Sequence, residues 1–148
     1  MRGIILLLLV LPCASLASDP VDRFTVSFTD ALDQIIVRAC FHGTPPTRLY
    51  RHEDAGRFSD GIYIGKQKLT ARSDRWGVYL PAGLEGNCMD WRVDITTLLK
   101  ANNYRFGFRV NGDLLLENSL WLWKGPRDRA IEIEVQAPKG LTISVPWR

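Results

Sequence analysis

Two histidines, His42 and His52, are the residues best suited to metal or acid–base chemistry. The pair His52-Glu53 begins like the HExxH helix of zinc peptidases, in which two histidines one helical turn apart bind the metal and the glutamate acts as general base. Positions 54–56 read Asp-Ala-Gly, so the second histidine is missing. The sequence therefore predicts no zinc site here and no other metal or cofactor site.

The chain contains three cysteines, Cys13, Cys40 and Cys88. Cys13 lies in an N-terminal segment that we predict to be removed, which leaves two cysteines in an oxidising compartment, where a disulfide is the natural pairing. Cys40 could instead act as a thiol nucleophile with His42 as its base, but Cys40 lies in a predicted strand and a second cysteine is available. We therefore predict a disulfide between Cys40 and Cys88.

Acid–base catalysis by carboxylates requires two groups whose environments separate their pKa values. Neighbouring carboxylates occur at Asp30/Asp33, Glu53/Asp54 and Asp90/Asp94. The first pair is typical of a turn, Asp94 is typical of a helix N-cap, and Asp90 is expected on a solvated strand face. We assign no catalytic residue, and we predict that this chain is not an enzyme.

Residues Leu120 to Lys124 read Leu-Trp-Leu-Trp-Lys, the most unusual local feature of the chain. In a strand, Trp121 and Trp123 would project from one face about 7 Å apart. Exposed, such a pair would form a ligand surface for a sugar or a peptide. Buried, it would belong to the core, which is the favoured interpretation because aromatic side chains strongly drive burial.

The first 17 residues have the pattern of a signal peptide. Arg2 supplies the positive charge, Ile4 to Leu11 is an unbroken apolar run, and Ser15-Leu16-Ala17 provides small residues before a cleavage site. A lipoprotein signal at Cys13 is the weaker alternative, because Pro12 stands where a small residue is required. We expect residues 1–17 to be removed and the protein to be exported to the periplasm or the extracellular space.

The remaining residues, 18–148, have the composition of a single globular domain. The chain is 46% hydrophobic and 24% charged, which argues against disorder. Its net charge of +3, or +2 without Arg2, is too small and too evenly spread to predict a nucleic acid as partner. The apolar run of the signal peptide is too short to cross a bilayer, and no later segment could do so.

Short strand-like runs follow one another after Val21, separated by turn residues about 8 to 12 positions apart. Alternation marks several as half-buried, whereas Gln34 to Phe41 is apolar enough for a central strand packed on both faces. The sequence predicts an all-β fold: an antiparallel β-sandwich of about nine short strands with one short helix at 94–100. The strands are expected to come from among twelve candidate runs: Phe24 to Phe28, Gln34 to Phe41, Thr47 to Tyr50, Phe58 to Ile64, Lys66 to Ala71, Trp76 to Leu80, Cys88 to Asp94, Tyr104 to Val110, Asp113 to Glu117, Leu120 to Lys124, Ala130 to Gln136 and Leu141 to Val145.

Four stretches together resemble a known family: VRACFHGTPPTRL (Val37 to Leu49), GNCMDWRVDIT (Gly86 to Thr96), LLLENSLWLWKGP (Leu114 to Pro126) and IEVQAPKGLTISVPW (Ile133 to Trp147). They are similar to the N-terminal β-domain that precedes the catalytic domain in bacterial secreted zinc metallopeptidases of the glycyl aminopeptidase type. The resemblance extends from about Phe24 to Trp147. It rests on strand patterns, two cysteines and an aromatic-Pro ending.

In that family the zinc-binding HExxH lies in a downstream domain, so the resemblance transfers no catalytic residue to this chain. It implies a noncatalytic domain, free-standing or from a truncated copy, that packs beside a peptidase catalytic domain or another protein and helps to shape access to the catalytic cleft. The alternative is a carbohydrate- or peptide-binding module that uses the Trp121/Trp123 strand. A complete enzyme is the third hypothesis.

Overall fold

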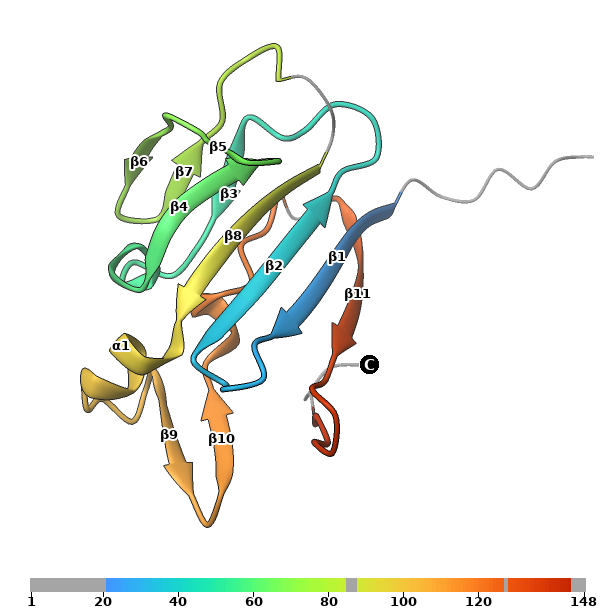
Figure 1. Ribbon diagram of the computed structural model, residues 1–148. Coiled ribbons are helices and arrows are strands. Elements are labelled where there is room, and N and C mark those ends of the chain that lie inside the picture. Colours follow the sequence, from blue (N-terminus) through green and yellow to red (C-terminus); the bar gives the residue numbers. More distant parts are fainter. Residues whose placement is uncertain (1–20, 85–87, 127, 145–148) are drawn as a thin grey trace, which may run out of the picture.

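The computed structural model describes residues 21–84, 88–126 and 128–144 (Figure 1). The predicted signal peptide, 1–17, lies outside the described residues. Over these ranges the chain is all-β, with many short strands, one short α-helix and two turns of 3-10 helix. In chain order the elements are β1 (Val21–Phe28), β2 (Gln34–Cys40), β3 (Arg48–Tyr50), η1 (Ala55–Arg57), β4 (Ser59–Ile64), β5 (Gln67–Lys68), β6 (Arg72–Asp74), β7 (Gly77–Tyr79), β8 (Cys88–Asp94), α1 (Ile95–Lys100), β9 (Gly107–Val110), β10 (Asp113–Leu116), η2 (Asn118–Leu120) and β11 (Ala130–Gln136).

A six-stranded sheet with the order β11-β1-β2-β8-β4-β5 is the main layer. Its strand pairs are antiparallel except that β11 lies parallel to β1, from Val21 opposite Ala130 to Ser27 opposite Gln136. The prediction of a mainly antiparallel fold is confirmed. The parallel edge strand is an addition that alternation alone could not reveal, because alternation defines the faces of a strand and not its partner.

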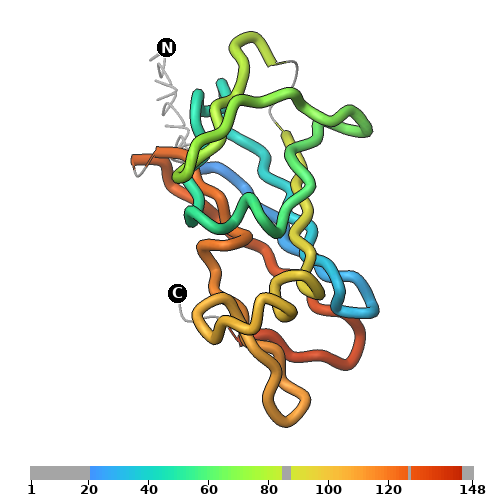
Figure 2. The backbone as a smooth tube through the Cα atoms, turned by 90° about the vertical axis from the view of Figure 1, so that its left-hand side faces the viewer, coloured from blue at the N-terminus to red at the C-terminus, as the bar shows by residue number. Residues whose placement is uncertain are grey.

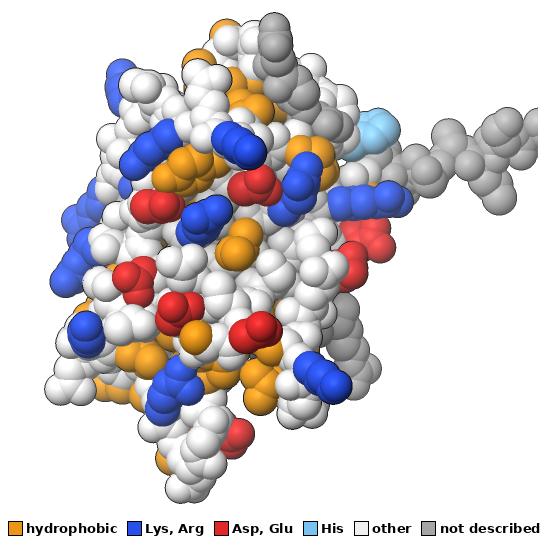
Figure 3. Space-filling view, in the orientation of Figure 1, with side chains coloured by type: hydrophobic (Ala, Val, Ile, Leu, Met, Phe, Trp, Pro, Cys, Tyr) orange, Lys and Arg blue, Asp and Glu red, His pale blue; other side chains and the backbone are white. Residues whose placement is uncertain are grey.

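One face of this sheet forms the core. Alternate side chains of β1, β2 and β8 point to that face and are fully buried; they include Phe24, Val37 and Trp91. The opposite face is open, and Figure 3 shows basic and acidic side chains interspersed over it. The expectation that β2 packs on both faces is therefore wrong. Arg38 of β2 is exposed and lies 3.9 Å from Asp90 of β8 on the open face.

The second layer of the core is formed by the three-stranded sheet β3-β7-β6 and by the segment that contains η2. Leu49 of β3 and Val78 of β7 are paired and buried in the core. The hairpin β9–β10 projects at the far end of the molecule from β6 and β7 (Figure 2). This layer covers one side of the main sheet only, which explains why the other side is polar.

Local signals in the sequence determine the start of α1 and the turn between β9 and β10. Asp94 is the N-cap of α1: its carboxylate accepts hydrogen bonds from the backbone N–H of Thr97 at 2.8 Å and from the Thr97 hydroxyl at 2.8 Å. The N–H bond from Thr97 lowers the pKa of Asp94. Asn111 and Gly112, with φ of 50° and 91°, form the turn between β9 and β10, as their residue types predict.

Two predicted strands are not formed. Leu120 to Lys124 leaves the extended conformation, because the backbone N–H groups of Trp121 and Leu122 both donate to the Asn118 carbonyl, at 3.1 and 2.8 Å. Only Lys124 makes a β-bridge, to Tyr50. The other predicted strand is Leu141 to Val145. Its residues 141–144 are irregular, and Val145 lies outside the described residues.

Candidate functional site

The predicted disulfide is present between Cys40 and Cys88, at the paired ends of β2 and β8. The two Cα atoms lie 4.0 Å apart. Because both strands are central in the main sheet, the bond fixes their register beside the core. Its position makes it structural: it joins two strands of the scaffold and leaves neither thiol available as a nucleophile.

Trp123 is a core residue. Its ring stacks on Trp91 with centroids 5.1 Å apart and planes 6° apart, and it is 1% exposed. Its Nε1–H donates to the Leu120 carbonyl at 3.1 Å, so the polar atom of the indole is satisfied inside the protein. The guanidinium of Arg51 lies 5.0 Å from the centre of the same ring. Trp123 is therefore not positioned to contact a ligand.

Trp121 has a different environment from Trp123, because the turn after η2 separates the directions of their side chains. Its carbonyl accepts a 2.8 Å hydrogen bond from the Trp91 indole. Its side chain is 6% exposed and forms part of the wall of a cavity. The tryptophans do not form the expected ladder; their burial matches the core alternative, and Trp121 alone borders a candidate site.

This cavity has a volume of about 310 Å³, within the range of small-ligand sites. It lies where the end of β1, the β10 strand, η2 and the chain after β11 meet. Most of its wall is aliphatic or aromatic, and the described wall contains two acids and no Lys, Arg or His. The lining residues are Phe28, Leu32, Gly112, Asp113, Leu114, Leu116, Glu117, Asn118, Trp121, Val135, Pro138, Leu141, Thr142, Ile143 and Ser144.

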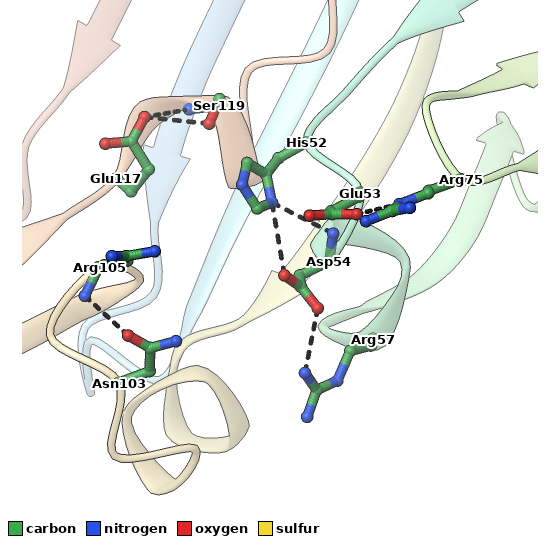
Figure 4. Close-up of polar contacts among 9 residues, drawn as sticks. All are labelled: His52, Glu53, Asp54, Arg57, Arg75, Asn103, Arg105, Glu117 and Ser119. Atoms are coloured by element: carbon green, nitrogen blue, oxygen red, sulfur yellow. Dashed lines mark hydrogen bonds and ion pairs between the residues drawn. The ribbon is translucent and has the colours of Figure 1, made fainter.

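The acidic side of the cavity is formed by Asp113 at the start of β10 and Glu117 at the N-cap of η2. Glu117 Oε1 accepts hydrogen bonds from the backbone N–H of Ser119 at 3.3 Å and from its hydroxyl at 3.0 Å, which fixes the carboxylate (Figure 4). The site therefore combines an apolar hollow with two carboxylates. Such a site can hold an apolar group that carries a positive charge beside it.

Each histidine takes part in a hydrogen bond that involves a backbone N–H group. His52 Nδ1 accepts a 3.1 Å hydrogen bond from the Asp54 N–H, so in the neutral ring the proton is on Nε2 (Figure 4). The His52 ring also lies edge-on to Phe106, with centroids 6.3 Å apart. His42 uses its own backbone N–H to bond Asp22, at 2.9 Å. Within the described ranges, no three His, Cys, Asp or Glu side chains are close enough to hold a metal ion.

Most residues of the cavity carry no recognisable signal in the sequence. Residues 141–144 belong to a run predicted as a strand, Leu141 to Val145, and the runs that contain β9 and β10 are predicted only as strands. The one visible signal is the Asn111-Gly112 turn, which joins β9 to β10 and so places Asp113 and Leu114 at the start of the second strand of a projecting hairpin. The hairpin and the chain after β11 border one cavity because β11 pairs in parallel with β1, a pairing that the sequence does not indicate.

A scan against models of protein families finds no match, and searches of curated proteins and of solved structures find none either. Over the ranges that the structure describes, no helix has the length and apolar character needed to cross a membrane. The function must therefore be argued from the chain's own surfaces and cavities.

Proposed function

We propose that this chain is a noncatalytic interaction domain of an exported system, and that it receives an apolar side chain of a protein partner in the cavity beside Trp121. The observation that carries the proposal is the cavity itself: about 310 Å³, mostly apolar and bordered by two carboxylates, of which Glu117 is held by hydrogen bonds from Ser119. Sites of this kind bury an apolar group and use few polar contacts to orient it. Export is the expectation from the predicted signal peptide.

The chemistry of the wall favours a polypeptide over a carbohydrate. Sugars stack on exposed flat rings and need many hydrogen-bonding groups, whereas among the described residues the aromatic lining is limited to Phe28 and Trp121 and the rest of the apolar wall is aliphatic. Asp113 and Glu117 add negative charge. The preferred occupant is a leucine- or tryptophan-like side chain next to a lysine, an arginine or an amino terminus.

The partner class follows from the resemblance to the β-domain of glycyl aminopeptidase-type metallopeptidases. That resemblance suggests a peptidase catalytic domain, supplied by the same or a neighbouring reading frame, with this chain packed beside it. The chain itself offers the two histidines described above and no matching zinc-ligand spacing. Peptide hydrolysis by the purified protein that a chelator abolishes would contradict the noncatalytic assignment.

The cavity can be tested by NMR on the purified protein with the dipeptide amides Trp-Lys and Leu-Lys, and with Leu-Glu as the charge-reversed probe. We expect the lysine peptides to shift the resonances of Leu114, Leu116 and Trp121. Glu117→Gln should weaken the binding of the lysine peptides about two- to fivefold, which is the effect expected from the loss of a partly exposed ion pair.

A filled-cavity variant provides the matched control. Leu116 lines the cavity, whereas Leu115, its neighbour on β10, is 44% exposed and does not line it. Leu116→Trp should abolish the shifts and Leu115→Trp should leave them intact. Equal effects of the two variants, or lysine peptides that shift only residues outside the cavity, would refute the proposal.

A further inference from the structure

The outward face of the three-stranded sheet carries a row of paired side chains that the cavity does not involve. Arg48 of β3 lies opposite Tyr79 of β7, which in turn lies opposite Arg72 of β6. Leu49 and Val78, in the next row, point inward to the core. Strand alternation therefore places two arginines and a tyrosine side by side on the solvent face.

Arg48 lies flat across this face. Its guanidinium carbon is 4.9 Å from the centre of the Tyr50 ring and 4.8 Å from that of Tyr79. Gly77 leaves the space for it, because a Cβ at Gly77 would lie 2.7 Å from Arg48 Nε. The far end of Arg48 donates to both oxygens of Asp74, at 2.9 and 2.8 Å.

Asp74 fixes the arrangement. Besides Arg48, its carboxylate accepts a 2.8 Å hydrogen bond from the backbone N–H of Trp76 and a 2.9 Å bond from the Tyr79 hydroxyl. The Trp76 N–H bond, helped by Tyr79 and Arg48, lowers the pKa of Asp74, so the carboxylate stays charged at neutral pH. The side chains are thus held in place before any partner arrives.

Positive charge remains on this face after the internal pairs are counted. Arg72 lies 5.0 Å from the centre of the Tyr79 ring, and among the described residues it has no carboxylate partner. Arg75 lies over Trp76 at 5.0 Å and is bonded to Glu53 (Figure 4). Lys124 joins the edge through its backbone bridge to Tyr50. Of the three arginines on this face, Arg48 is paired with Asp74 and Arg75 with Glu53, so the charge of Arg72 is the excess.

Trp76 and Tyr50 each have an arginine over one side of the ring, and the rest of each ring is open to solvent: Trp76 is 51% exposed and Tyr50 is 48% exposed. We propose that this arginine–aromatic face, made of Arg48, Tyr50, Arg72, Trp76 and Tyr79, binds an acidic segment of a partner protein. Trp, Tyr and Arg dominate the energetics of protein interfaces, and a guanidinium pairs bidentately with a carboxylate. The excess positive charge makes an acidic partner complementary.

A polysaccharide fits this face less well. Sugar rings stack on free aromatic faces, but guanidinium groups already lie over the rings of Tyr50, Trp76 and Tyr79. What the surface offers is the N–H edges of Arg72, which lies over the Tyr79 ring, together with the exposed parts of the Tyr50 and Trp76 rings. An acidic polypeptide can use both, since it brings carboxylates for Arg72 and side-chain carbon for the rings.

The test measures fluorescence anisotropy of a labelled peptide of alternating Glu and Gly, with alternating Gln and Gly as the uncharged probe. Arg72→Ala and Trp76→Ala should each weaken the acidic peptide about tenfold, the loss expected for one interface anchor. Arg105 and Tyr104 provide matched controls: the Arg105 guanidinium lies 5.9 Å from the Tyr104 ring, and Tyr104 is 75% exposed. Arg105→Ala and Tyr104→Ala should leave binding within about twofold.

Arg72→Lys keeps the charge but removes the planar fork, so it should retain only part of the affinity. Circular dichroism melts should show every variant folded, since all four sites are exposed. Failure of the acidic peptide to bind, an equal loss in Arg105→Ala, or tighter binding of hyaluronate or single-stranded DNA than of the acidic peptide would overturn the proposal. The face shares no residue with the cavity, so its failure would not affect the cavity proposal.

Discussion

Asp22 is the buried charged residue of the described structure, and its removal should show how the edge strand β11 is tied to β1 and to the chain after β2. It is 2% exposed, and Arg129 donates to it with Nε at 2.5 Å and with a terminal nitrogen at 2.6 Å. The backbone N–H of His42 is a third donor, at 2.9 Å. This one carboxylate joins the start of β1, the chain after β2 and the chain before β11.

We expect Asp22→Asn to lower the free energy of unfolding by about 2 kcal/mol. The amide keeps the volume and an acceptor for His42, but it removes the charge that faces Arg129. Breaking a fully buried pair costs about 3 to 5 kcal/mol. The lower figure applies because the Arg129 side chain is 26% exposed and can recover part of its hydration.

The same variant should change how stability depends on pH. Burial alone would raise the pKa of Asp22, but the hydrogen bond and charge of Arg129, with the His42 N–H, outweigh burial and lower it. The pKa is then lower in the folded than in the unfolded chain, so the contribution is complete above an unfolded pKa of about 4. It is lost as the pH falls through the folded pKa, and wild type and Asp22→Asn should converge there.

Urea unfolding with the disulfide intact measures both effects, and an exposed pair on the same two strands is the control. Arg23 and Glu132 lie 3.2 Å apart with side chains 78% and 65% exposed. Arg23→Ala should cost at most about 0.5 kcal/mol. A loss in Asp22→Asn as small as that of Arg23→Ala, or a difference from wild type that persists unchanged at acid pH, would refute the reasoning.

Three further outcomes follow from packing and covalent structure. Trp123→Ala should cost about 3 to 5 kcal/mol in urea melts, because a fully buried ring stacked on Trp91 is lost, whereas the exposed Trp76→Ala should cost less than about 0.5 kcal/mol. Replacing Cys40 and Cys88 together by Ser should lower stability by about 4 kcal/mol, since the bond closes a loop with a sequence separation of 48; reductant should then have no further effect. Gly77→Ala should cost about 1 to 3 kcal/mol and weaken acidic-peptide binding, because the new Cβ would lie 2.6 Å from the Leu49 carbonyl and displace Arg48.

Local patterns were sufficient to predict several elements. Alternation in Cys88 to Asp94 placed Met89, Trp91 and Val93 on one face, and all three are buried in the core. The Asp94 cap and the Asn-Gly turn also follow from residue type, because each depends on hydrogen bonds or φ values within a few residues. These features need no information from distant parts of the chain.

The arginine–aromatic face and the cavity could not be predicted in the same way. Arg48, Tyr79 and Arg72 become neighbours only through two strand registers, and Asp74 completes the group from the edge strand. This row of side chains therefore exists only because β3 and β6 both pair with β7. The sequence shows the individual residues, but their contacts appear only once β3, β7 and β6 have been ordered.

The tryptophan segment shows why a strand pattern can fail even where alternation is strong. Glu117, Asn118 and Ser119, immediately before it, are turn and cap formers, and Glu117 in fact accepts from the Ser119 N–H. The 3-10 turn η2, which begins at Asn118, and the bend after it send Trp123 into the stack with Trp91 and leave Trp121 at the cavity. Because alternation assumes an extended chain, the cap residues were the better signal: a 3-10 turn that includes Leu120 separates two rings that a strand would have kept on one face.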